Sequence, residues 1–222
     1  MVDAREFFEA GLTLHGHKCP AMPLGLRAGA AAMNKLGVPR SSDKTLMALV
    51  ELGDAHCAHC FGDGVQMVTG CTFGKGNIKQ LGYGKFGLTL VDRTTGRAVR
   101  VVPRAESQLE TKKTSFFQDY RMKGVPASRV PDEVVDPLIE MVLTAPEADM
   151  FAIGEVFDYD VPAKEENFAS FVCDRCGDLV VESYGRVVGD QRVCIPCQEV
   201  LVAESESPVA ARKPGVEMAG AV

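Results

Sequence analysis

The sequence predicts an α+β fold, in which a mixed core domain of helices packed on a β-hairpin or sheet precedes a small C-terminal unit. Segments with helical spacing of apolar residues and segments typical of strands alternate over roughly the first 160 residues. The polar stretch PAKEEN at 162–167 then interrupts the pattern, and two closely spaced cysteine pairs follow it. We therefore expect a core domain over 1–162, a compact unit over 169–201 and a disordered tail over 202–222, where large apolar residues are scarce.

The first part of the core domain is predicted to contain two helices, a strand and a short helix or turn. Helical spacing of apolar residues covers 3–16, and a second helix covers 22–38 before Gly37 and Pro39 end it. A strand is expected over 45–52 and a short helix or turn over 61–70. The second helix has a face of small residues, against which another element can pack very closely: Gly25, Ala28, Gly29 and Ala32.

The second part of the core domain is predicted to start with a β-hairpin and to continue as helices. Two strand-like runs flank the turn RTTGR within 85–103. The texture of 104–145 is helical, and one helix is expected to start with Pro131, a residue favoured at the first helical position. A further strand is expected over 150–162.

Composition and charge narrow the functional classes. The chain of 222 residues has a formal net charge of −6, which argues against a general affinity for nucleic acid or for an anionic membrane. No apolar run approaches the roughly 18 residues that span a bilayer, and acidic residues stand near the N-terminus where a signal peptide would be basic. We expect a soluble, cytoplasmic protein. In a reducing compartment its eight cysteines favour metal or redox chemistry over disulfides.

The clearest motif is a cysteine quartet near the C-terminus. Two C-x-x-C pairs are separated by a stretch that is long enough to form a hairpin: Cys173, Cys176, Cys194 and Cys197. This spacing is typical of a tetrahedral four-thiolate zinc site, with a rubredoxin-like iron site as the alternative. A unit of about 30 residues buries too little apolar surface to fold alone, so the metal is expected to supply folding energy. Because four thiolates leave no open coordination position, we expect a structural role.

A second candidate centre lies near the N-terminus, in the stretch HGHKCP. All four histidines of the chain lie in this stretch and in the later stretch HCAHCFGDG, each of which also contains cysteine. His15, His17 and Cys19 are spaced two residues apart, so an extended backbone would direct their side chains to one side. Pro20 favours that extended conformation at Cys19.

The later stretch offers more ligands than one ion needs. Its candidates are His56, Cys57, His59, Cys60 and Asp63. Cysteine with histidine favours zinc or iron over magnesium or calcium. Some of these side chains are therefore expected to be catalytic, to support the ligands, or to be structural.

Two further features near Cys60 leave alternatives open. Cys71 is a ligand, a redox thiol or a buried residue, and a neighbouring lysine would lower its pKa. The glycine- and lysine-rich stretch 72–87 is either an anion-binding loop or a surface turn, and it lacks the spacing of a phosphate-binding P-loop.

Three stretches of the core resemble the FmdE family, which is named after a component of formylmethanofuran dehydrogenase. They are FFEAGLTLHGHKCPAMPLGLRAG, CFGDGVQMVTGCTFGKGN and YGKFGLTLVD, and the resemblance covers about 7–162. Some members of that family also carry a C-terminal treble-clef zinc finger, which the cysteine quartet matches. The resemblance implies a mixed α+β core with a metal site and an auxiliary finger.

The resemblance does not imply oxidation of formylmethanofuran, since the molybdenum or tungsten chemistry of that complex belongs to another of its components. His56, Cys57 and His59 are additions to the family motif in this chain.

From the motif and its spacing we expect His17, Cys19 and Cys60 to hold a zinc or iron ion, with His15 as a fourth ligand or a supporting group. Three ligands would leave a position open for water or substrate. Asp63 would orient a ligand histidine or act as a base, which makes Cys60 and Asp63 the candidate catalytic residues.

The favoured function is a metal-binding protein whose finger contacts a partner protein. The first alternative is a stand-alone metal- or thiol-dependent enzyme with redox or one-carbon chemistry at the core site. The second alternative is a zinc-finger regulatory protein. We also expect a homodimer or a hetero-complex, because the small-residue helix and the stretch KFGLTLV suggest close-packed surfaces. The sequence names no small-molecule ligand.

Overall fold

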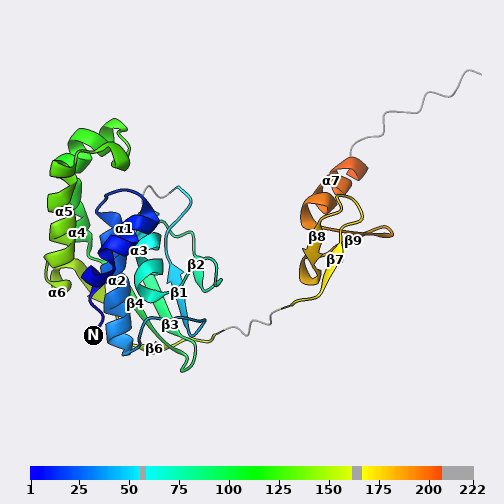
Figure 1. Cartoon of the computed structure of the whole chain (residues 1–222), viewed down its shortest axis with the longest axis horizontal. Coiled ribbons are helices and arrows are strands. Elements are labelled where there is room, and N and C mark those ends of the chain that lie inside the picture. Colours follow the sequence, from blue (N-terminus) through cyan, green and yellow to red (C-terminus); the bar gives the residue numbers. More distant parts are fainter. Residues whose placement is uncertain (56–58, 162–166, 207–222) are drawn as a thin grey trace, which may run out of the picture. The chain divides into compact units, whose positions relative to one another are not determined.

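The computed structural model describes residues 1–55, 59–161 and 167–206, and the chain divides into two compact units, Met1–Val161 and Pro162–Val222 (Figure 1). Mixed helices and strands in these units confirm the predicted α+β class. Each unit is described by itself below.

The first unit opens with a helical segment that supplies one end of the candidate core site. Its first elements are η1 (Ala4–Phe7), α1 (Phe8–His15), α2 (Ala21–Leu36), β1 (Leu46–Val50) and α3 (Cys60–Thr69). The expected first helix is thus a 3-10 turn followed by α1, which Gly16 ends in the left-handed conformation at φ 84°. Asp3 caps the 3-10 turn by accepting a hydrogen bond from the backbone N–H of Arg5.

The rest of the first unit contains the predicted hairpin and a helical region. Its elements are β2 (Ile78–Gln80), β3 (Leu88–Asp92), β4 (Arg97–Pro103), α4 (Ala105–Lys112), η2 (Phe116–Tyr120), η3 (Arg121–Lys123), η4 (Ala127–Arg129), α5 (Asp132–Thr144), α6 (Glu147–Met150), β5 (Phe151–Ile153) and β6 (Phe157–Asp158). Two expectations need correction. Pro131 precedes α5 instead of starting it, and the strand expected over 150–162 is split into β5 and β6.

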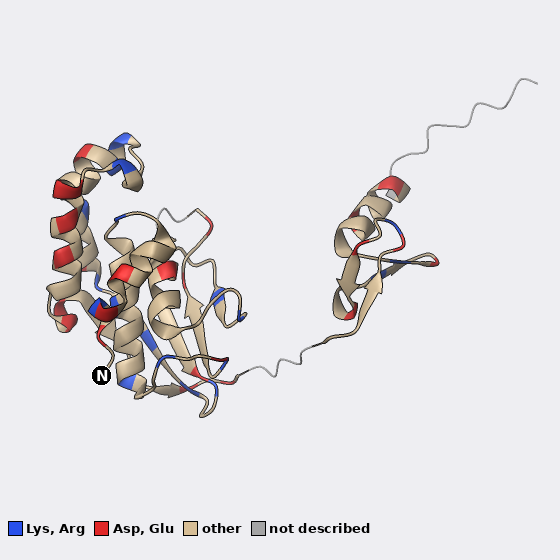
Figure 2. Ribbon diagram, in the orientation of Figure 1, with Lys and Arg blue, Asp and Glu red and all other residues tan. Residues whose placement is uncertain are grey.

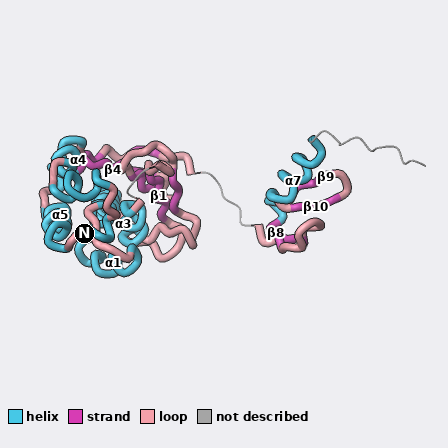
Figure 3. The backbone as a smooth tube through the Cα atoms, turned by 90° about the horizontal axis from the view of Figure 1, so that it is seen from above, coloured by secondary structure: helices cyan, strands magenta, loops and turns pink. Residues whose placement is uncertain are grey.

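The sheet of the first unit has the strand order β2-β1-β3-β4-β5, and β6 also pairs with β4. β2 runs parallel to β1, whereas the other pairs are antiparallel. α2 packs against β3 and β4 and α3 packs against β1, so both helices cover one face of the sheet (Figures 1 and 3). On the other face, Leu49, Val91 and Ala98 form a smaller cluster with Tyr159 and Val161.

α2 and α3 pack so closely that glycine is required where they meet. A Cβ at Gly25 would lie 2.0 Å from the carbonyl oxygen of Phe61, and a Cβ at Gly64 would lie 2.1 Å from that of Met22. Both contacts are with backbone, which cannot rotate out of the way as a side chain can. This close approach brings the segment before α2 and the first residue of α3 together.

The small face of α2 is therefore occupied inside the chain. Gly25 contacts Phe61, and Gly29 packs against Val68 of α3. The stretch KFGLTLV is also internal, since β3 is buried along its whole length in the sheet. Neither feature is a free surface, so the expected homodimer loses the two observations that motivated it and stays a prediction.

The second unit consists of short strands and a helix around the cysteine quartet. Its elements are β7 (Ser170–Val172), β8 (Leu179–Val181), η5 (Glu182–Tyr184), β9 (Arg186–Val188), β10 (Gln191–Val193) and α7 (Ile195–Glu206). β7 pairs with β8 and β9 pairs with β10, both antiparallel. α7 continues to Glu206, so the disordered tail expected from residue 202 is wrong for 202–206, and 207–222 lie outside the described residues.

Among the described helices, none combines the length and the apolar character needed to cross a membrane.

Candidate metal centres

The core site forms where three segments of the first unit meet. His15 is the last residue of α1, His17 and Cys19 lie in the segment between α1 and α2, and Cys60 is the first residue of α3. One donor atom from each of these four residues lies within 4.8 Å of the others. The structure thus brings together the four residues that the sequence suggested as core ligands. Cys19 is buried, and the other three are partly buried.

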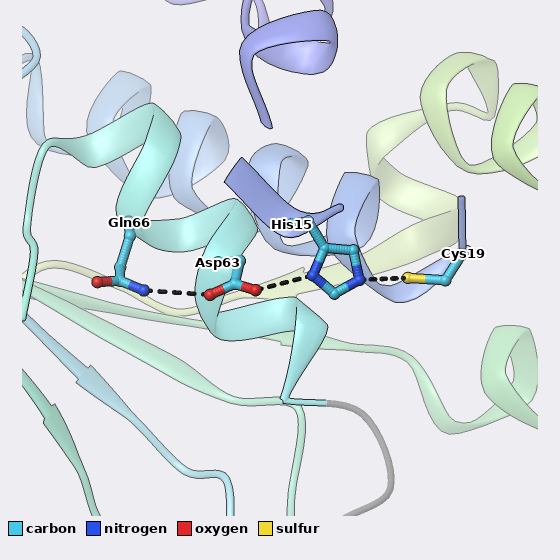
Figure 4. Close-up of polar contacts among 4 residues, drawn as sticks. All are labelled: His15, Cys19, Asp63 and Gln66. Atoms are coloured by element: carbon cyan, nitrogen blue, oxygen red, sulfur yellow. Dashed lines mark hydrogen bonds and ion pairs between the residues drawn. The ribbon is translucent and has the colours of Figure 1, made fainter. Parts of the chain in front are cut away.

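His15 is oriented by polar contacts on both sides of its ring (Figure 4). Its Nδ1 lies 2.8 Å from Oδ2 of Asp63, and its Nε2 lies 3.4 Å from Sγ of Cys19. In a tetrahedral site with ordinary zinc–nitrogen and zinc–sulfur bonds, neighbouring nitrogen and sulfur ligands are about 3.6 Å apart. Nε2 therefore faces the position of an ion, while the carboxylate holds the other nitrogen, as in many metal sites.

Asp63 is itself held by the next turn of α3. Nε2 of Gln66 donates a hydrogen bond to Oδ1 of Asp63 at 3.3 Å (Figure 4), and Oε1 of Gln66 accepts one from the backbone N–H of Phe73 at 3.0 Å. This chain of contacts connects the histidine to the loop after α3. Asp63 is thus placed to orient His15, which is one of the two roles predicted for it.

The segment between α1 and α2 is also tied to α5. Lys18, which lies between His17 and Cys19, pairs with Asp132 at 2.8 Å and with Asp136 at 2.9 Å. Acidic residues gather along α5 in Figure 2. The Lys18 side chain is thus directed away from the donor atoms, as expected for alternate residues of an extended segment.

The two thiols of the core site share a hydrogen bond. The Cys60 thiol bonds to the Cys19 sulfur, and the backbone N–H groups of Met22 and Ala21 also point at that sulfur, so the pKa of Cys19 is lowered in spite of its burial. The same shared bond, together with burial, raises the pKa of Cys60. Such a pair has one thiolate ready to bind a cation, and metal binding would displace the second proton.

His17 is held in its neutral form by its surroundings. Burial lowers its pKa, and the positive charges of His15 and Arg121 lower it further. The rings of His15 and His17 have centroids 4.1 Å apart. Neutral imidazole is the form that binds metals. Two imidazoles and two thiols that converge in this way suit zinc or iron, not the all-oxygen sites of magnesium or calcium.

The other ligand candidates of the second stretch do not join this cluster within the described residues. His59 is exposed and precedes α3. His56 and Cys57 lie outside the described residues.

Cys71 and the glycine- and lysine-rich stretch have structural surroundings. Cys71 is fully buried, and burial raises the pKa of its thiol to about 11. Nζ of Lys75 donates a hydrogen bond to the carbonyl oxygen of Ser41 at 3.1 Å. The stretch continues into β2, a strand that the sequence interpretation missed because glycines and lysines obscure its pattern. These contacts favour a buried thiol and a structural turn over a redox thiol and an anion-binding loop.

The C-terminal quartet forms the second cluster, whose four sulfur atoms lie within 4.8 Å of one another. Sγ of Cys176 and Sγ of Cys194 are 3.9 Å apart, close to the separation of about 3.8 Å expected of two thiolates on one zinc. Cys173 and Cys176 lie in the turn between β7 and β8, and Cys197 lies in the first turn of α7. Backbone N–H groups, first that of Cys176 and then that of Cys194, lower the pKa of Cys173 to about 6.

Comparison with known families assigns both units. Residues 14–152 match the family described as "FmdE, Molybdenum formylmethanofuran dehydrogenase operon". The chain belongs to this family. Residues 166–202 match the prokaryotic dksA/traR C4-type zinc finger. The family and the finger implied by the sequence motifs are thus confirmed, and the four-cysteine finger points to zinc in the C-terminal unit.

A solved structure and a curated relative are similar to this chain. The crystal structure of an FmdE-like protein of tungsten formylmethanofuran dehydrogenase from Syntrophus aciditrophicus has a TM-score of 0.60 and 20% identity, and the match covers 89% of this chain and 96% of that one. At this identity the likeness shows the fold. A probable S-adenosyl-L-methionine-binding protein of Archaeoglobus fulgidus is 42% identical over 97 residues, which is 42% of this chain. The match spans only 25% of that relative's length.

Proposed function

We propose that the protein binds a transition metal in its core through His15, His17, Cys19 and Cys60, in addition to zinc in its C-terminal finger. The convergence of these four donor atoms, with His15 turned toward them by Asp63, is the observation that supports the proposal best. The close packing of α2 on α3 supports it further, because it holds Cys19 and Cys60 together without help from an ion.

The proposed core ion is zinc or iron. Two imidazole and two thiolate ligands suit either metal, and four ligands complete a tetrahedron around zinc. If His15 supports the site without binding, the remaining three ligands leave a position open. The contact between Nε2 of His15 and Sγ of Cys19 favours His15 as the fourth ligand.

A stand-alone enzyme is the second candidate function. It is favoured by a pocket of about 520 Å³ whose lining includes both Cys19 and Cys60. Cys60 would be the reacting thiol or a displaceable ligand in such an enzyme. Asp63, whose side chain is 35% exposed, would position His15 or accept a proton.

The finger would contact a partner protein. Val172 and Leu179 face each other across β7 and β8 and are 59% and 73% exposed. Exposed apolar side chains on a small unit are typical of protein-binding surfaces. A cytoplasmic location, a homodimer and a regulatory role of the finger remain alternatives of the same proposal, and each needs its own measurement.

X-ray absorption at the metal K-edge tests the core site. The Cys176→Ser variant removes the four-thiolate site, so the spectrum reports on the core ion. We expect two sulfur and two nitrogen neighbours. A shell of oxygen and nitrogen alone would refute the proposed ligands. Metal analysis and the absorption spectrum of anaerobically purified protein then decide between a colourless zinc site and a coloured iron site.

A further inference from the structure

The pocket beside the core thiols has the size and the walls of a small-molecule site. Its volume of about 520 Å³ lies in the range typical of such pockets. Cys19 and Cys60 form one part of its lining, and Phe86, Phe116 and Phe117 form apolar parts. The pocket lies entirely within the first unit, between the start of α2 and the helical region that follows β4.

A smaller apolar cavity of about 80 Å³ adjoins this pocket. The two share lining residues, among them Pro20, Phe86 and Phe117. The smaller cavity extends inward to Leu24 and Met150. A ligand in the pocket can therefore bury an apolar group between α2 and the sheet.

The charged residues that line the pocket, among those the structure describes, are all positive. They are Lys85, Lys112 and Arg121. The charge of the pocket is thus opposite to that of the whole chain, whose formal net charge is −6. The neighbouring carboxylate of Glu51 is already neutralised, because Arg100 donates to both of its oxygens.

The two lysines are available to a ligand. Within the part of the chain that the structure describes, neither Lys85 nor Lys112 forms an ion pair. Arg121 donates one N–H to the carbonyl oxygen of Val125 at 2.6 Å, which fixes its guanidinium group. Its charge acts on His17, so it lies close to the core site as well as to the pocket.

We propose that this pocket binds a small organic anion with an aromatic or otherwise apolar body, held by Lys85, Lys112 and Arg121 next to the core thiols. The body lies against Phe86 and Phe117, and the anionic group meets the cationic rim. A neutral molecule of the same shape gains only the apolar contacts, and a cation is repelled. The proposal goes beyond the metal-binding function and does not depend on it.

A pair of fluorescent probes tests the proposal on the full chain. The anionic probe is 8-anilinonaphthalene-1-sulfonate, and its neutral counterpart, N-phenyl-1-naphthylamine, lacks the sulfonate. We expect the anionic probe to bind more tightly, and the Lys85→Gln, Lys112→Gln double variant to weaken its binding about fivefold, as for the loss of two partly solvated charge contacts. The binding of the neutral probe should not change.

The matched control is the double variant Lys113→Gln, Lys123→Gln, which removes the same charge outside the pocket. Both control lysines are exposed and pair with neighbouring acids. We expect the control to bind the anionic probe like the wild type. Equal loss in both double variants, or equal affinity for the two probes, would overturn the proposal. Metal analysis of the same samples separates the two claims, because a missing core metal would refute the metal site and leave the result on the pocket unaffected.

Discussion

The two clusters of metal-binding side chains differ in what holds them together. The core site lies at the end of two helices that pack on a sheet, beside a buried cluster that includes Met22, Leu26 and Phe61. In the described part of the second unit, the buried apolar residues are Phe171, Cys173 and Val193, and one of these is itself a candidate zinc ligand. The comparison teaches that the first unit can form its site without an ion, whereas the second unit needs the ion in order to fold.

The ligands are positioned by different means for the same reason. In the core, His15 is oriented by a carboxylate that is in turn bound by Gln66. In the finger, Cys173 is oriented by backbone N–H groups, those of Cys176 and Cys194. Substitutions in the two units should therefore have effects that differ in kind.

The largest expected effect is the loss of the finger in the variant Cys176→Ser. Zinc in a four-thiolate finger contributes on the order of 10 kcal/mol to folding, more than this small unit can replace. We expect the second unit to unfold while the core melts at its normal temperature. Circular dichroism and calorimetry measure both. If the whole chain lost its cooperative transition, the two units would not be independent.

A smaller but still large effect is expected for Gly25→Ala in the core. The added Cβ would meet the carbonyl oxygen of Phe61 at 2.0 Å, so α2 and α3 must separate. We expect a loss of about 3 kcal/mol in the free energy of unfolding, with a weaker core metal site. Urea denaturation measures the first and metal analysis the second.

Gly37→Ala is the matched control for that substitution. Gly37 has a left-handed conformation, at φ 72°, but a Cβ there would meet no atom within 4 Å. The substitution should cost only about 1 kcal/mol and leave the core metal in place. Equal effects of the two substitutions would argue against close helix packing as the device that aligns Cys19 with Cys60.

Asp63→Asn should weaken core metal binding without unfolding either unit. The amide is nearly isosteric with the carboxylate but cannot stabilise the Nδ1–H of His15 as well. We expect metal affinity to fall about 10- to 100-fold, measured by chelator competition. His59→Ala serves as the control, because His59 is exposed, and it should change nothing. A stronger loss in His59→Ala than in Asp63→Asn would place the ligands elsewhere.

The smallest expected effect is the proton balance of the finger. The pKa of Cys173 is lowered to about 6, so the metal-free thiol loses its proton as the pH rises through that value. Zinc binding must displace this proton at a pH about one unit below that pKa, but not at a pH about one unit above it. The number of protons released should therefore fall by about one over this interval. Calorimetry in buffers of different ionisation enthalpy measures it, with His17→Ala, Cys19→Ala protein to exclude the core site.

Much of the fold follows from local patterns that the sequence displays directly. The turn RTTGR predicted the β3–β4 hairpin, and the small residues of α2 predicted a close partner, which is α3. β2 was missed because it is short and pairs with β1 from a distant part of the chain. The split of β5 from β6 was missed as well, since apolar residues continue on both sides of Gly154.

The candidate site was predictable in its residues but not in their arrangement. The spacing in HGHKC suggested His17 and Cys19 as partners, and the family resemblance suggested Cys60. No pattern in the sequence shows that Asp63 binds Nδ1 of His15, because the contact joins residues 48 positions apart. The pocket beside Cys19 was equally hidden, since its walls come from segments that only the fold brings together.

The number of metal ions per chain tests most directly whether the protein has two separate metal centres. We expect about two ions in the wild type and about one in each of two variants, Cys176→Ser and His17→Ala, Cys19→Ala, since each cluster holds a single ion. The second variant should keep the zinc of its finger and the fold of its core. An unchanged metal content in His17→Ala, Cys19→Ala protein would contradict this expectation, because the core site as described would then not exist.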